Sequence, residues 1–541
     1  MSTPLFTRRE KLLEEMRNGE SLHWDMIIIG GGITGAGILR EAVRRGYRAL
    51  LVEQADFSSG TSSRSSKMIH GGLRYLAAGD LKLTKESLKE RERLLLEAPG
   101  LVDRISFYFT LSKGLFPGRW AMAVILTIYD FIAGIRDHRY FNNLRLGAKF
   151  SGLQQQHLNG AAAYSDAMVD DSRLVLRVLQ ESIDAGGAAI NYTRVKQLVL
   201  EQDQTQVEGV ILCDPDNPDS NGHESNLSLQ LRAPVVINAT GAWADRLRNQ
   251  VNPEKRIRPL RGSHLIIPRQ LMPVTDVLTS LHPEDNRGVY IYPWEGATVI
   301  GTTDLDHAED LDIEASITEA EVDYLLRAYN VQFPARPLKR TDIISTWAGV
   351  RPVIGSESSK DPSRERRDHA VWSDSGLVTV SGGKLTTFRL IALDALAAAR
   401  DLLPEPQHVD NDQIFSQPQI SAAELVPHNS AWGQRLLGRY GMQAQPMLET
   451  APVEEQQPIA GTEFCLAECR WAARHEAVIH LDDLLLRRTR LGMLLTDGGS
   501  ELLSTLQPIC AEELGWDSSR WQFEVDRYLD IWKRFYSLPV R

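Results

Sequence analysis

The sequence has little cysteine, no excess of positive charge and no long apolar run. Its four cysteines in 541 residues form no CxxC pair, which excludes a disulfide framework and fits a reducing compartment. Cys465 and Cys469 lie one helical turn apart, and we expect buried apolar side chains there rather than metal ligands. The net charge of −11 repels phosphate backbones, so nucleic acid is not expected as a partner.

Candidate membrane segments are also scarce. Residues 1–24 mix basic and acidic side chains without a continuous apolar run, so we expect an N-terminal leader segment and no signal peptide. The most apolar stretch, residues 120–135, is broken by Asp130 and is too short to span a bilayer. We expect either a buried helix here or a helix that lies on a bilayer surface.

The first recognisable unit begins at residue 25. A short β-branched run at 25–29 leads into a glycine cluster, and apolar residues then recur with the spacing of one helix face. A second apolar run at 49–52 ends in Glu53, which completes a βαβ unit. The fold therefore opens as an α/β dinucleotide-binding domain of the Rossmann type.

Later segments extend this domain and interrupt it. Apolar strands at 234–241 and 377–381 each enter a glycine turn, which places both turns at the carboxyl edge of one sheet. Between them, residues 264–300 contain the pattern of antiparallel strands. The predicted domains are a nucleotide-binding domain at 25–400, an inserted antiparallel-sheet substrate (cap) domain mainly at 99–160 and 258–343, a linker at 401–419, and a C-terminal helical domain at 420–541.

The glycine cluster fits the GxGxxG fingerprint of dinucleotide binding. Gly30 makes the turn, Gly32 lets the backbone approach a pyrophosphate, and Gly35 lets the helix pack on the strand. Glu53, at the end of the second strand, is placed to hold ribose hydroxyls. The hydroxyl-rich run SSGTSSRSS at 58–66 favours FAD, since it can donate to phosphates and to the flavin edge; a solvated serine linker is the alternative.

Several further motifs share a family resemblance. The chain resembles the FAD-dependent glycerol-3-phosphate dehydrogenases in nine segments taken in order: GGGITG at 30–35, TSSRSSKMIHGGLRYL at 61–76, YSDAMVDDSRLVL at 164–176, NATGAWAD at 238–245, GSHLIIP at 262–268, GTTD at 301–304, AGVRP at 348–352, GGKLTTFR at 382–389 and DDLLLRRTR at 482–490. Ordered motifs are far more specific than a lone GxGxxG. The loop at 214–226 and the segment at 443–459 have no chemical interpretation, which leaves the role of the C-terminal domain open.

The resemblance implies an activity and a location. It implies oxidation of sn-glycerol 3-phosphate to dihydroxyacetone phosphate, with hydride passing to flavin N5 and electrons to a membrane quinone. We therefore expect a homodimer bound peripherally at the cytoplasmic face of the inner membrane, or in the cytoplasm. The residues expected to contact FAD are Gly30, Gly32, Ile33, Thr34, Gly35, Glu53, Thr61, Ser62, Ser63, Ser66, Lys67, His70, Gly71, Gly72, Gly241, Gly382, Gly383, Lys384, Leu385 and Thr386.

The chemistry needs a base, a cation near the flavin and a clamp for the substrate phosphate. For the clamp we expect Arg74, Tyr75, Arg351, Arg367 and Lys384, because an acidic protein that binds a dianion must gather its cations locally. Arg351 and Lys384 are also expected to act in catalysis, Lys384 by stabilising the reduced flavin from a helix start.

His264 is the candidate base, because a neutral imidazole can take the alcohol proton near neutral pH. Hydrogen bonding to the substrate and a structural role are the alternatives for this histidine. His70 is a second candidate, although its His-Gly-Gly setting also suits a turn that shapes the flavin site.

Competing functions differ mainly in the electron acceptor. A glycerol-3-phosphate oxidase would give its electrons to oxygen, and burial of the apolar segment 121–135 would favour that reading. An amine or amino-acid oxidase would need fewer cations around its substrate. A flavin-binding protein without turnover, or a flavoprotein that binds RNA, is disfavoured by the candidate base, by the arginine set and by the negative net charge.

Overall fold

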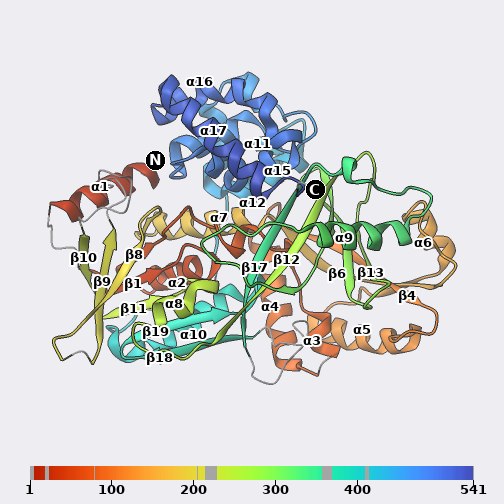
Figure 1. The fold of residues 1–541 in the computed structure, drawn as a ribbon, viewed down its shortest axis with the longest axis horizontal. Helices are drawn as coiled ribbons and strands as arrows, with labels where there is room; N and C mark the ends of the chain where they lie inside the picture. The colour runs from red at the N-terminus through yellow and green to blue at the C-terminus, as the bar shows by residue number, and fades with distance from the viewer. Residues whose placement is uncertain are drawn as a thin grey trace.

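The computed structural model describes residues 5–18, 23–77, 79–203, 205–213, 228–355, 368–407 and 413–539. Within them lie two large sheets, one on the left and one on the right of Figure 1, with a group of helices from the end of the chain across the top. This α/β arrangement with an inserted antiparallel layer and a helical C-terminal domain confirms the predicted fold class.

The first sheet is the nucleotide-binding sheet. Its strand order is β18-β19-β11-β1-β2-β7, and all neighbours are parallel except the edge pair β18 and β19. The strands are β1 (Met26–Ile29), β2 (Ala49–Val52), β7 (Ala188–Ile190), β11 (Val235–Asn238), β18 (His369–Asp374) and β19 (Leu377–Gly382). The central strands are buried on both faces, which explains their continuous runs of β-branched residues.

Different layers cover its two faces. On one face, α2 (Ile33–Arg44) packs against α7 (Asp171–Asp184) and α10 (Phe388–Ala398), so closely that a Cβ at Gly37 would lie 2.8 Å from Phe388. On the other lies a small antiparallel sheet of β8 (Val195–Leu200), β9 (Val207–Cys213) and β10 (Ser228–Arg232). Helix α1 (Leu5–Arg17), from the predicted leader segment, adds buried Leu13 and Met16 to the same core.

The second sheet forms the cap. Its order is β16-β12-β15-β14-β13-β4-β6-β3, with β17 paired to β12 and β5 paired to β6. The strands are β3 (Met68–Ile69), β4 (Val102–Ser112), β5 (Arg139–Phe141), β6 (Leu158–Val169), β12 (Ile257–Pro268), β13 (Val277–Leu281), β14 (Gly288–Trp294), β15 (Ala297–Gly301), β16 (Leu305–Asp306) and β17 (Ser345–Ile354). Helices α6 (Asn143–Lys149) and α9 (Glu319–Gln332) cover one face.

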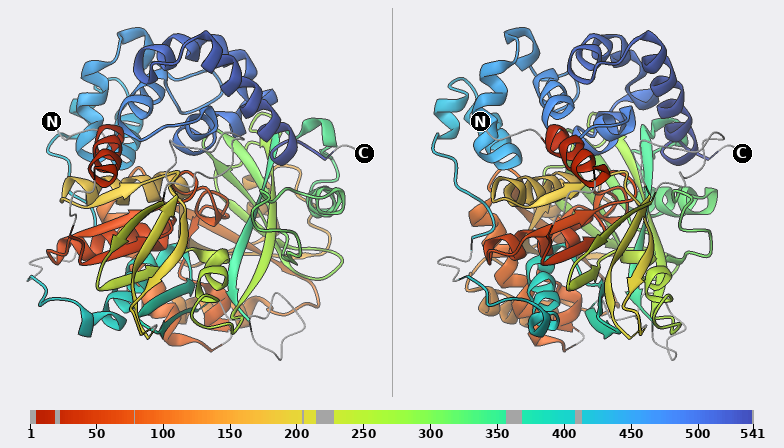
Figure 2. Two further views of the ribbon diagram at one scale, coloured as in Figure 1. Left: turned by 60° about the vertical axis from the view of Figure 1, so that its left-hand side comes forward. Right: turned by 90° about the vertical axis from the view of Figure 1, so that its left-hand side faces the viewer.

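The C-terminal helices cover the other face of the cap sheet. Their core contains Trp294 and Trp347 from the cap together with apolar residues of the last helices, so the two parts share one hydrophobic cluster. The longer helices are α12 (Ser430–Tyr440), α13 (Ala444–Thr450), α14 (Leu466–His475), α16 (Leu503–Leu514) and α17 (Ser518–Phe535). Cys465 and Cys469 are buried here, as predicted. Figure 2 shows these helices above both sheets.

The connection to the C-terminal domain packs against the first domain. After η6 (Arg400–Leu402) the chain runs along the nucleotide-binding domain, where Ile414 and Phe415 are both 1 % exposed. The backbone of Ile414 donates to the Glu97 carboxylate and accepts from Arg40. The predicted linker is therefore anchored to the first domain at Ile414 and Phe415.

Candidate active site

The turn between β1 and α2 has a geometry that requires glycine. Gly30 has a φ of +114°, and a Cβ there would lie 2.6 Å from the carbonyl oxygen of Ala239. A Cβ at Gly35 would lie 1.9 Å from the carbonyl oxygen of Gly30, so α2 packs directly on the turn. Gly32 is the N-cap of α2 and has no side chain to cap it. Because Gly32 has no side chain, an anion such as a pyrophosphate can approach the backbone at the helix start closely.

Glu53 closes this turn from the side. Its Oε2 accepts from the backbone N–H of Gly31 at 2.6 Å, and its Oε1 accepts from Ala55 at 2.9 Å. The carboxylate is buried, and burial raises its pKa above the ordinary value. Besides its predicted role toward ribose hydroxyls, Glu53 thus braces the glycine turn.

Residues 53–67 connect β2 to β3, and we call them the serine loop. Ser62 Oγ accepts from the backbone N–H of Ile33 at 3.0 Å, which ties the loop to the start of α2. The Thr61 hydroxyl donates to the carbonyl of Val350 on β17. The loop therefore bridges the nucleotide-binding domain and the cap, which a solvated linker would not do.

The end of the serine loop reaches the candidate base. Ser66 Oγ lies 2.9 Å from His264 Nε2, and the imidazole stacks on Trp347 with ring centroids 4.4 Å apart. Both rings come from paired positions of β12 and β17. Gly301 is in register with His264 on the other side, and a Cβ there would lie 2.1 Å from the imidazole. The histidine is thus held from three sides.

The surroundings of His264 keep it neutral. The side chain is buried, and no described residue is hydrogen-bonded to its Nδ1. Burial lowers the pKa of His264 well below the ordinary value, and the positive charges of Arg351 and Lys67 lower it further. The imidazole is therefore in its neutral form at neutral pH, in which one ring nitrogen has a free lone pair.

Arg351 is fixed next to this histidine. Its Nη1 donates to Asp304 Oδ1 at 2.9 Å, and its Nη2 donates to Thr302 Oγ1 at 3.0 Å. The guanidinium passes over Gly262, where a Cβ would lie 2.2 Å from Nη2. About a fifth of the side chain stays exposed (21 %), so a fixed cation is presented at the surface of the site.

A second group of predicted residues gathers around the turn after β3. Lys384 Nζ donates to Ser87 Oγ at 2.6 Å and lies 3.9 Å from the centroid of the Tyr75 ring. The backbone N–H of His70 donates to Thr386 Oγ1 at 3.2 Å. The backbone N–H of Gly71 donates to Asp166, and Gly72 has a φ of +82°. The structure thus brings Tyr75, Lys384 and the His-Gly-Gly turn together.

The remaining glycine turns lie at the carboxyl edge of the nucleotide-binding sheet. Gly382, the last residue of β19, and Gly383, which follows it, both have a φ of +80°. Leu385 and Thr386 lie a little further on, in η5 (Leu385–Thr387). Gly241, after β11, has a φ of +60°, and no described atom lies within 4 Å of a Cβ built there. Ser381 donates to the carbonyl of Gly241 at 3.0 Å, which places the two turns side by side.

Two predicted clamp residues have side chains outside the described part of the structure. Arg74 belongs to α3 (Leu73–Ala77), but its side chain lies outside the described part of the structure. Arg367, with its neighbours Arg364 and Arg366, lies outside the described residues altogether. Their roles stay predictions, whereas Arg351 and Lys384 have defined positions.

Some residues of the site were not predicted individually. Asp304 and Thr302 orient Arg351, and Trp347 supports His264. Asp171 binds Lys67 and the backbone of Ser65 in the serine loop. The GTTD and DDSR motifs were visible in the sequence and contain three of these residues, but nothing in the chain signals which partners they meet.

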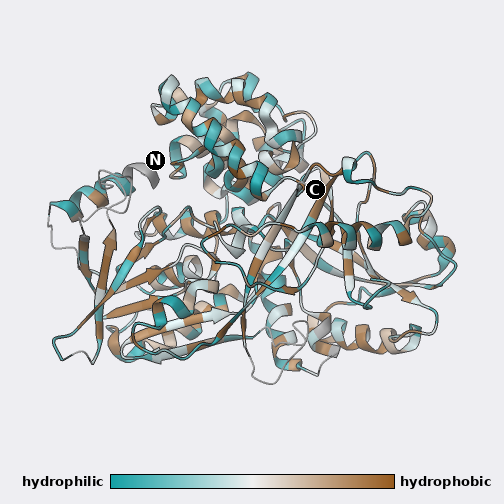
Figure 3. Cartoon of the chain, in the orientation of Figure 1, coloured by the Kyte–Doolittle hydropathy of each residue, from teal (hydrophilic) through white to brown (hydrophobic). Residues whose placement is uncertain are grey.

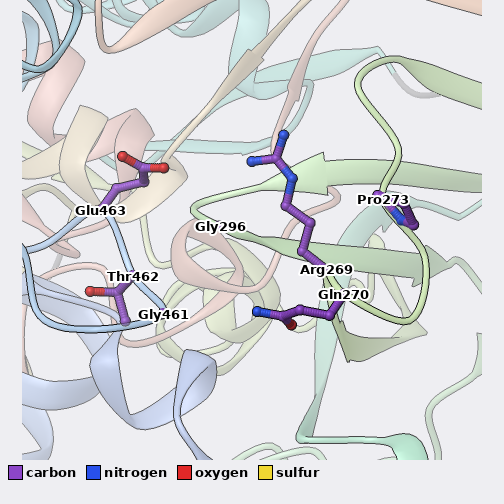
Figure 4. Close-up of a pocket in the computed structure, with 7 residues that line it drawn as sticks. All are labelled: Arg269, Gln270, Pro273, Gly296, Gly461, Thr462 and Glu463. Atoms are coloured by element: carbon purple, nitrogen blue, oxygen red, sulfur yellow. The ribbon is translucent and has the colours of Figure 1, made fainter.

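One open cavity lies away from these groups. It has a volume of about 400 Å³ and is lined by Arg269, Gln270, Pro273, Gly296, Gly461, Thr462 and Glu463 (Figure 4). It separates the β14–β15 turn from the C-terminal domain and contains none of the predicted site residues. Among the residues that the structure describes, no group of three metal-ligating side chains is found. In the same parts of the chain, no helix has the length and apolarity that crossing a membrane requires.

Comparison with known proteins places the chain in a family. Residues 25–392 match the family model described as FAD dependent oxidoreductase, and residues 412–521 match the C-terminal domain of alpha-glycerophosphate oxidase. The chain therefore belongs to the FAD-dependent oxidoreductases, and within them to the family of the glycerol-3-phosphate dehydrogenases and oxidases, as the following relatives indicate.

The similar proteins cover most of the chain. Glycerol-3-phosphate dehydrogenase 2 of Mycobacterium tuberculosis is 33% identical over 527 residues, which cover 94% of this chain and 87% of the relative. Aerobic glycerol-3-phosphate dehydrogenase of Bacillus subtilis is 34% identical over 408 residues, or 74% and 71% of the two chains. The structure of the glycerol-3-phosphate dehydrogenase of Bacillus halodurans complexed with FAD is similar with a TM-score of 0.75 at 26% identity, covering 98% of each chain.

These matches confirm two predictions. The cofactor is FAD, and the family is that of the FAD-dependent glycerol-3-phosphate dehydrogenases. The open helix start at Gly32 and the clear space at Gly241 fit such a dinucleotide, because a side chain at either turn would occupy the approach to the backbone.

Proposed function

We propose that the protein oxidises sn-glycerol 3-phosphate to dihydroxyacetone phosphate. The single observation that carries this proposal is the fixed Arg351 guanidinium beside the buried, neutral His264 at the end of the serine loop. This pairing supplies a cation and a proton acceptor in one place. The names of the similar dehydrogenases support the choice of substrate.

His264 takes the proton of the substrate hydroxyl in this proposal. Because the imidazole itself is buried and Ser66 is half-buried, the proton passes through Ser66 Oγ, which lies 2.9 Å from His264 Nε2. His264 is neutral at neutral pH, and in the proposed reaction its Nε2 carries the free lone pair while Nδ1 carries the hydrogen. FAD, when bound, supplies the hydride acceptor, its N5 atom.

The phosphate is held by cations. Arg351 is oriented by Asp304 and Thr302 before any substrate arrives, so little side-chain entropy is lost when it binds a phosphate. Lys384, with Tyr75 beside it, adds a second positive charge at the start of the segment after β19. Arg74 and Arg367 are proposed to complete the clamp.

Anaerobic reduction tests the proposal. We expect the FAD absorbance of the purified protein to bleach promptly when sn-glycerol 3-phosphate is added without oxygen. Glycerol at the same concentration is the control, because it has the reacting alcohol but no phosphate. A bound flavin that stays oxidised with sn-glycerol 3-phosphate would contradict the proposed substrate while leaving the cofactor assignment intact.

The proposed electron acceptor is a membrane quinone, reached at a lipid surface. Helix α5 (Arg119–Ala133) packs Met122, Leu126 and Tyr129 inward and leaves an apolar stripe outward. Figure 1 places α5 beside α3, the helix that carries Tyr75, and Figure 3 colours much of it as hydrophobic. The stripe and the preceding loop consist of Leu115, Phe116, Trp120, Val124, Ile128 and Phe131, which are 41–84 % exposed.

The charges around this stripe favour an anionic bilayer. Lys113, Arg119, Arg136 and Arg139 are all exposed around it, although the chain as a whole carries a net charge of −11. An outward aromatic stripe with a basic border is typical of a helix that lies in the plane of a membrane. The exposed outer face of α5 favours the quinone acceptor over oxygen, because a fully buried helix at 121–135 would have favoured an oxidase.

Acceptor assays separate the two candidates. We expect substrate-dependent reduction of a short-chain ubiquinone analogue to be far faster than formation of hydrogen peroxide in air. The oxidase is kept as the second candidate because the C-terminal domain matches that of alpha-glycerophosphate oxidase. The proposed homodimer and the inner-membrane location are tested by light scattering and by cell fractionation, respectively.

A further inference from the structure

We propose that the C-terminal domain is a positioning clamp for the serine loop, and that Arg490 is its central residue. This inference rests on the proposed role of the loop in holding FAD and in presenting Ser66 to His264. The clamp segment is residues 482–490, which contains η9 (Asp483–Arg488) and three buried arginines. Its contacts reach both ends of the loop.

Arg490 joins the C-terminal domain to the second half of the loop. It is buried (1 % exposed), and its Nη1 donates to the carbonyl of Ser63 at 3.2 Å. Its Nε donates to Asp170 at 3.1 Å, and its Nη2 donates to both Asp170 and Asp171. One guanidinium thus binds the loop backbone and the start of α7 together.

Asp171 passes this contact on to the loop. Its Oδ2 accepts from the backbone N–H of Ser65 at 2.9 Å and from the Ser65 hydroxyl at 2.8 Å. Its Oδ1 accepts from Lys67 Nζ at 2.9 Å, and the same ammonium donates to the Ser63 carbonyl. Ser66 lies between these two fixed residues, so its distance to His264 depends on them.

The other two arginines hold the first half of the loop. Arg488 Nη2 donates to Asp56 Oδ1 at 2.8 Å, and Arg487 donates to Asp56 Oδ2. Asp56 is fully buried and lies three residues after Glu53, which braces the glycine turn. The clamp segment therefore acts at the pyrophosphate turn as well as at the candidate base.

These contacts require arginine. A single guanidinium has several donors in a fixed plane, and Arg490 uses them on two carboxylates and two carbonyl groups, those of Ser63 and Leu486. If Arg490 were neutral, Asp170 and Asp171 would lose a buried partner, which is costly because water cannot replace it. The serine loop would then lose the hydrogen bond from Arg490 to the Ser63 carbonyl and the support that Arg490 gives to Asp171.

Replacement of Arg490 tests the clamp. In apoprotein titrated with FAD and followed by flavin fluorescence, we expect Arg490→Gln to weaken FAD binding at least about tenfold, or about 1.4 kcal/mol. Arg490→Lys should recover part of this affinity, because it restores the charge without the planar set of donors. Arg435→Gln is the matched control: Arg435 is also a mostly buried arginine of this domain and bridges Glu468 to Glu295 of the cap, but it contacts no residue of the serine loop in the described structure.

Comparison of the Arg490→Gln and Arg435→Gln variants distinguishes a positioning role from a purely structural one. If Arg490→Gln and Arg435→Gln lower the melting temperature alike and leave equal FAD affinity, Arg490 has only a structural role and the inference is wrong. If Arg490→Gln does not fold, amide hydrogen exchange of the FAD-bound Arg490→Lys protein gives the answer. Faster exchange confined to residues 53–67 supports the clamp, whereas exchange that rises only within the C-terminal helices contradicts it.

Failure of the proposed function would look different. Wild-type protein whose flavin is not bleached by sn-glycerol 3-phosphate contradicts the substrate but leaves the FAD titration of the variants interpretable. Wild-type protein that binds FAD, with Arg490→Gln binding it equally well, contradicts the clamp alone.

Discussion

At the scale of single residues, the site contains side chains that other protein groups hold in place. Arg351 keeps its guanidinium on Asp304 and Thr302, and His264 is stacked on Trp347 with one nitrogen on Ser66. Such fixed groups need little rearrangement when a charged substrate arrives. In the proposed function the two side chains make separate contributions, Arg351 to phosphate binding and His264 to proton removal.

Removing the Arg351 side chain should affect substrate binding most. Loss of a charge-assisted clamp costs on the order of 2 kcal/mol or more, so we expect Arg351→Ala to raise KM roughly 30-fold or more. Steady-state kinetics with sn-glycerol 3-phosphate measure this. Arg258→Ala is the control, because Arg258 on the neighbouring strand β12 has its main ion pair with the exposed Asp306. An unchanged KM in Arg351→Ala would show that Arg351 does not bind the substrate phosphate.

The buried neutral His264 should make stability depend on pH. Its pKa is low in the folded protein and near 6.5 in the unfolded chain, so unfolding takes up a proton as the pH falls below about 6.5. We expect the urea midpoint of the protein to fall with pH in that range and His264→Gln to reduce this dependence. The exposed His157→Gln should leave it unchanged. Parallel pH profiles of wild type and His264→Gln would contradict the assignment.

The same substitution should slow the reaction. Positioned acid–base groups contribute about 10²- to 10⁴-fold, so anaerobic flavin reduction in His264→Gln should be slower by roughly 100-fold or more. Rapid mixing of the FAD-bound variant with substrate measures this step apart from the electron acceptor. A rate close to that of wild type would mean that a group other than His264 acts as the base, and His70 is the next candidate.

Some of this site follows from sequence and some does not. Gly30, Gly35 and Glu53 lie within one βαβ unit, where local spacing determines the geometry. Arg490 and Asp171 are 319 positions apart, and no spacing rule brings them together. The contact of Ser66 with His264 crosses 198 positions for the same reason. Sequence motifs therefore indicated which segments matter, but only the fold pairs them.

At the scale of elements, α5 is a helix with two different apolar faces. Its inner face packs on the cap core through Met122, Leu126 and Tyr129, and its outer face exposes Trp120 and Phe131 at 79 % and 84 %. A helix of a purely cytosolic surface would carry polar side chains at these positions. The sequence alone left buried and surface-lying helices open, because both are apolar around much of the circumference.

Charge on the outer face of α5 should weaken the proposed membrane binding. We expect the double variant Trp120→Asp, Phe131→Asp to sediment with vesicles of phosphatidylglycerol and phosphatidylcholine at least about tenfold more weakly, since two aromatic rings no longer enter the lipid. Phe523→Asp is the control, because Phe523 is 55 % exposed on α17. Equal sedimentation of the two variants would contradict the docking role. Flavin reduction by substrate in detergent-free solution should be unaffected in both.

At the scale of the whole molecule, the C-terminal helices and the cap share one core. Trp294 and Trp347 of the cap lie in the same cluster as Leu484 and Tyr528 of the C-terminal domain. Buried ion pairs of Arg487 with Asp56 and of Arg490 with Asp170 also join the C-terminal domain to the nucleotide-binding domain. Two regions that share a core in this way are expected to unfold together in one cooperative transition. The C-terminal domain is therefore part of the oxidoreductase and not an appended module.

Unfolding should accordingly be one event. We expect a single calorimetric transition in which loss of bound flavin absorbance and loss of far-ultraviolet circular dichroism coincide. Two separated transitions, the first without flavin release, would contradict the shared core. Arg470→Gln, which breaks ion pairs within the C-terminal domain only, should shift the single transition without splitting it.

The order of strands in the nucleotide-binding sheet has a consequence for synthesis. β1 is made near the start of the chain, but its neighbour β11 comes at residues 235–238, and the far strand β19 comes at 377–382. The nucleotide-binding sheet can therefore be completed only after β19 has been synthesised. A nascent chain that stops before β19 lacks the strand that pairs with β11 and the turn formed by Gly382 and Gly383.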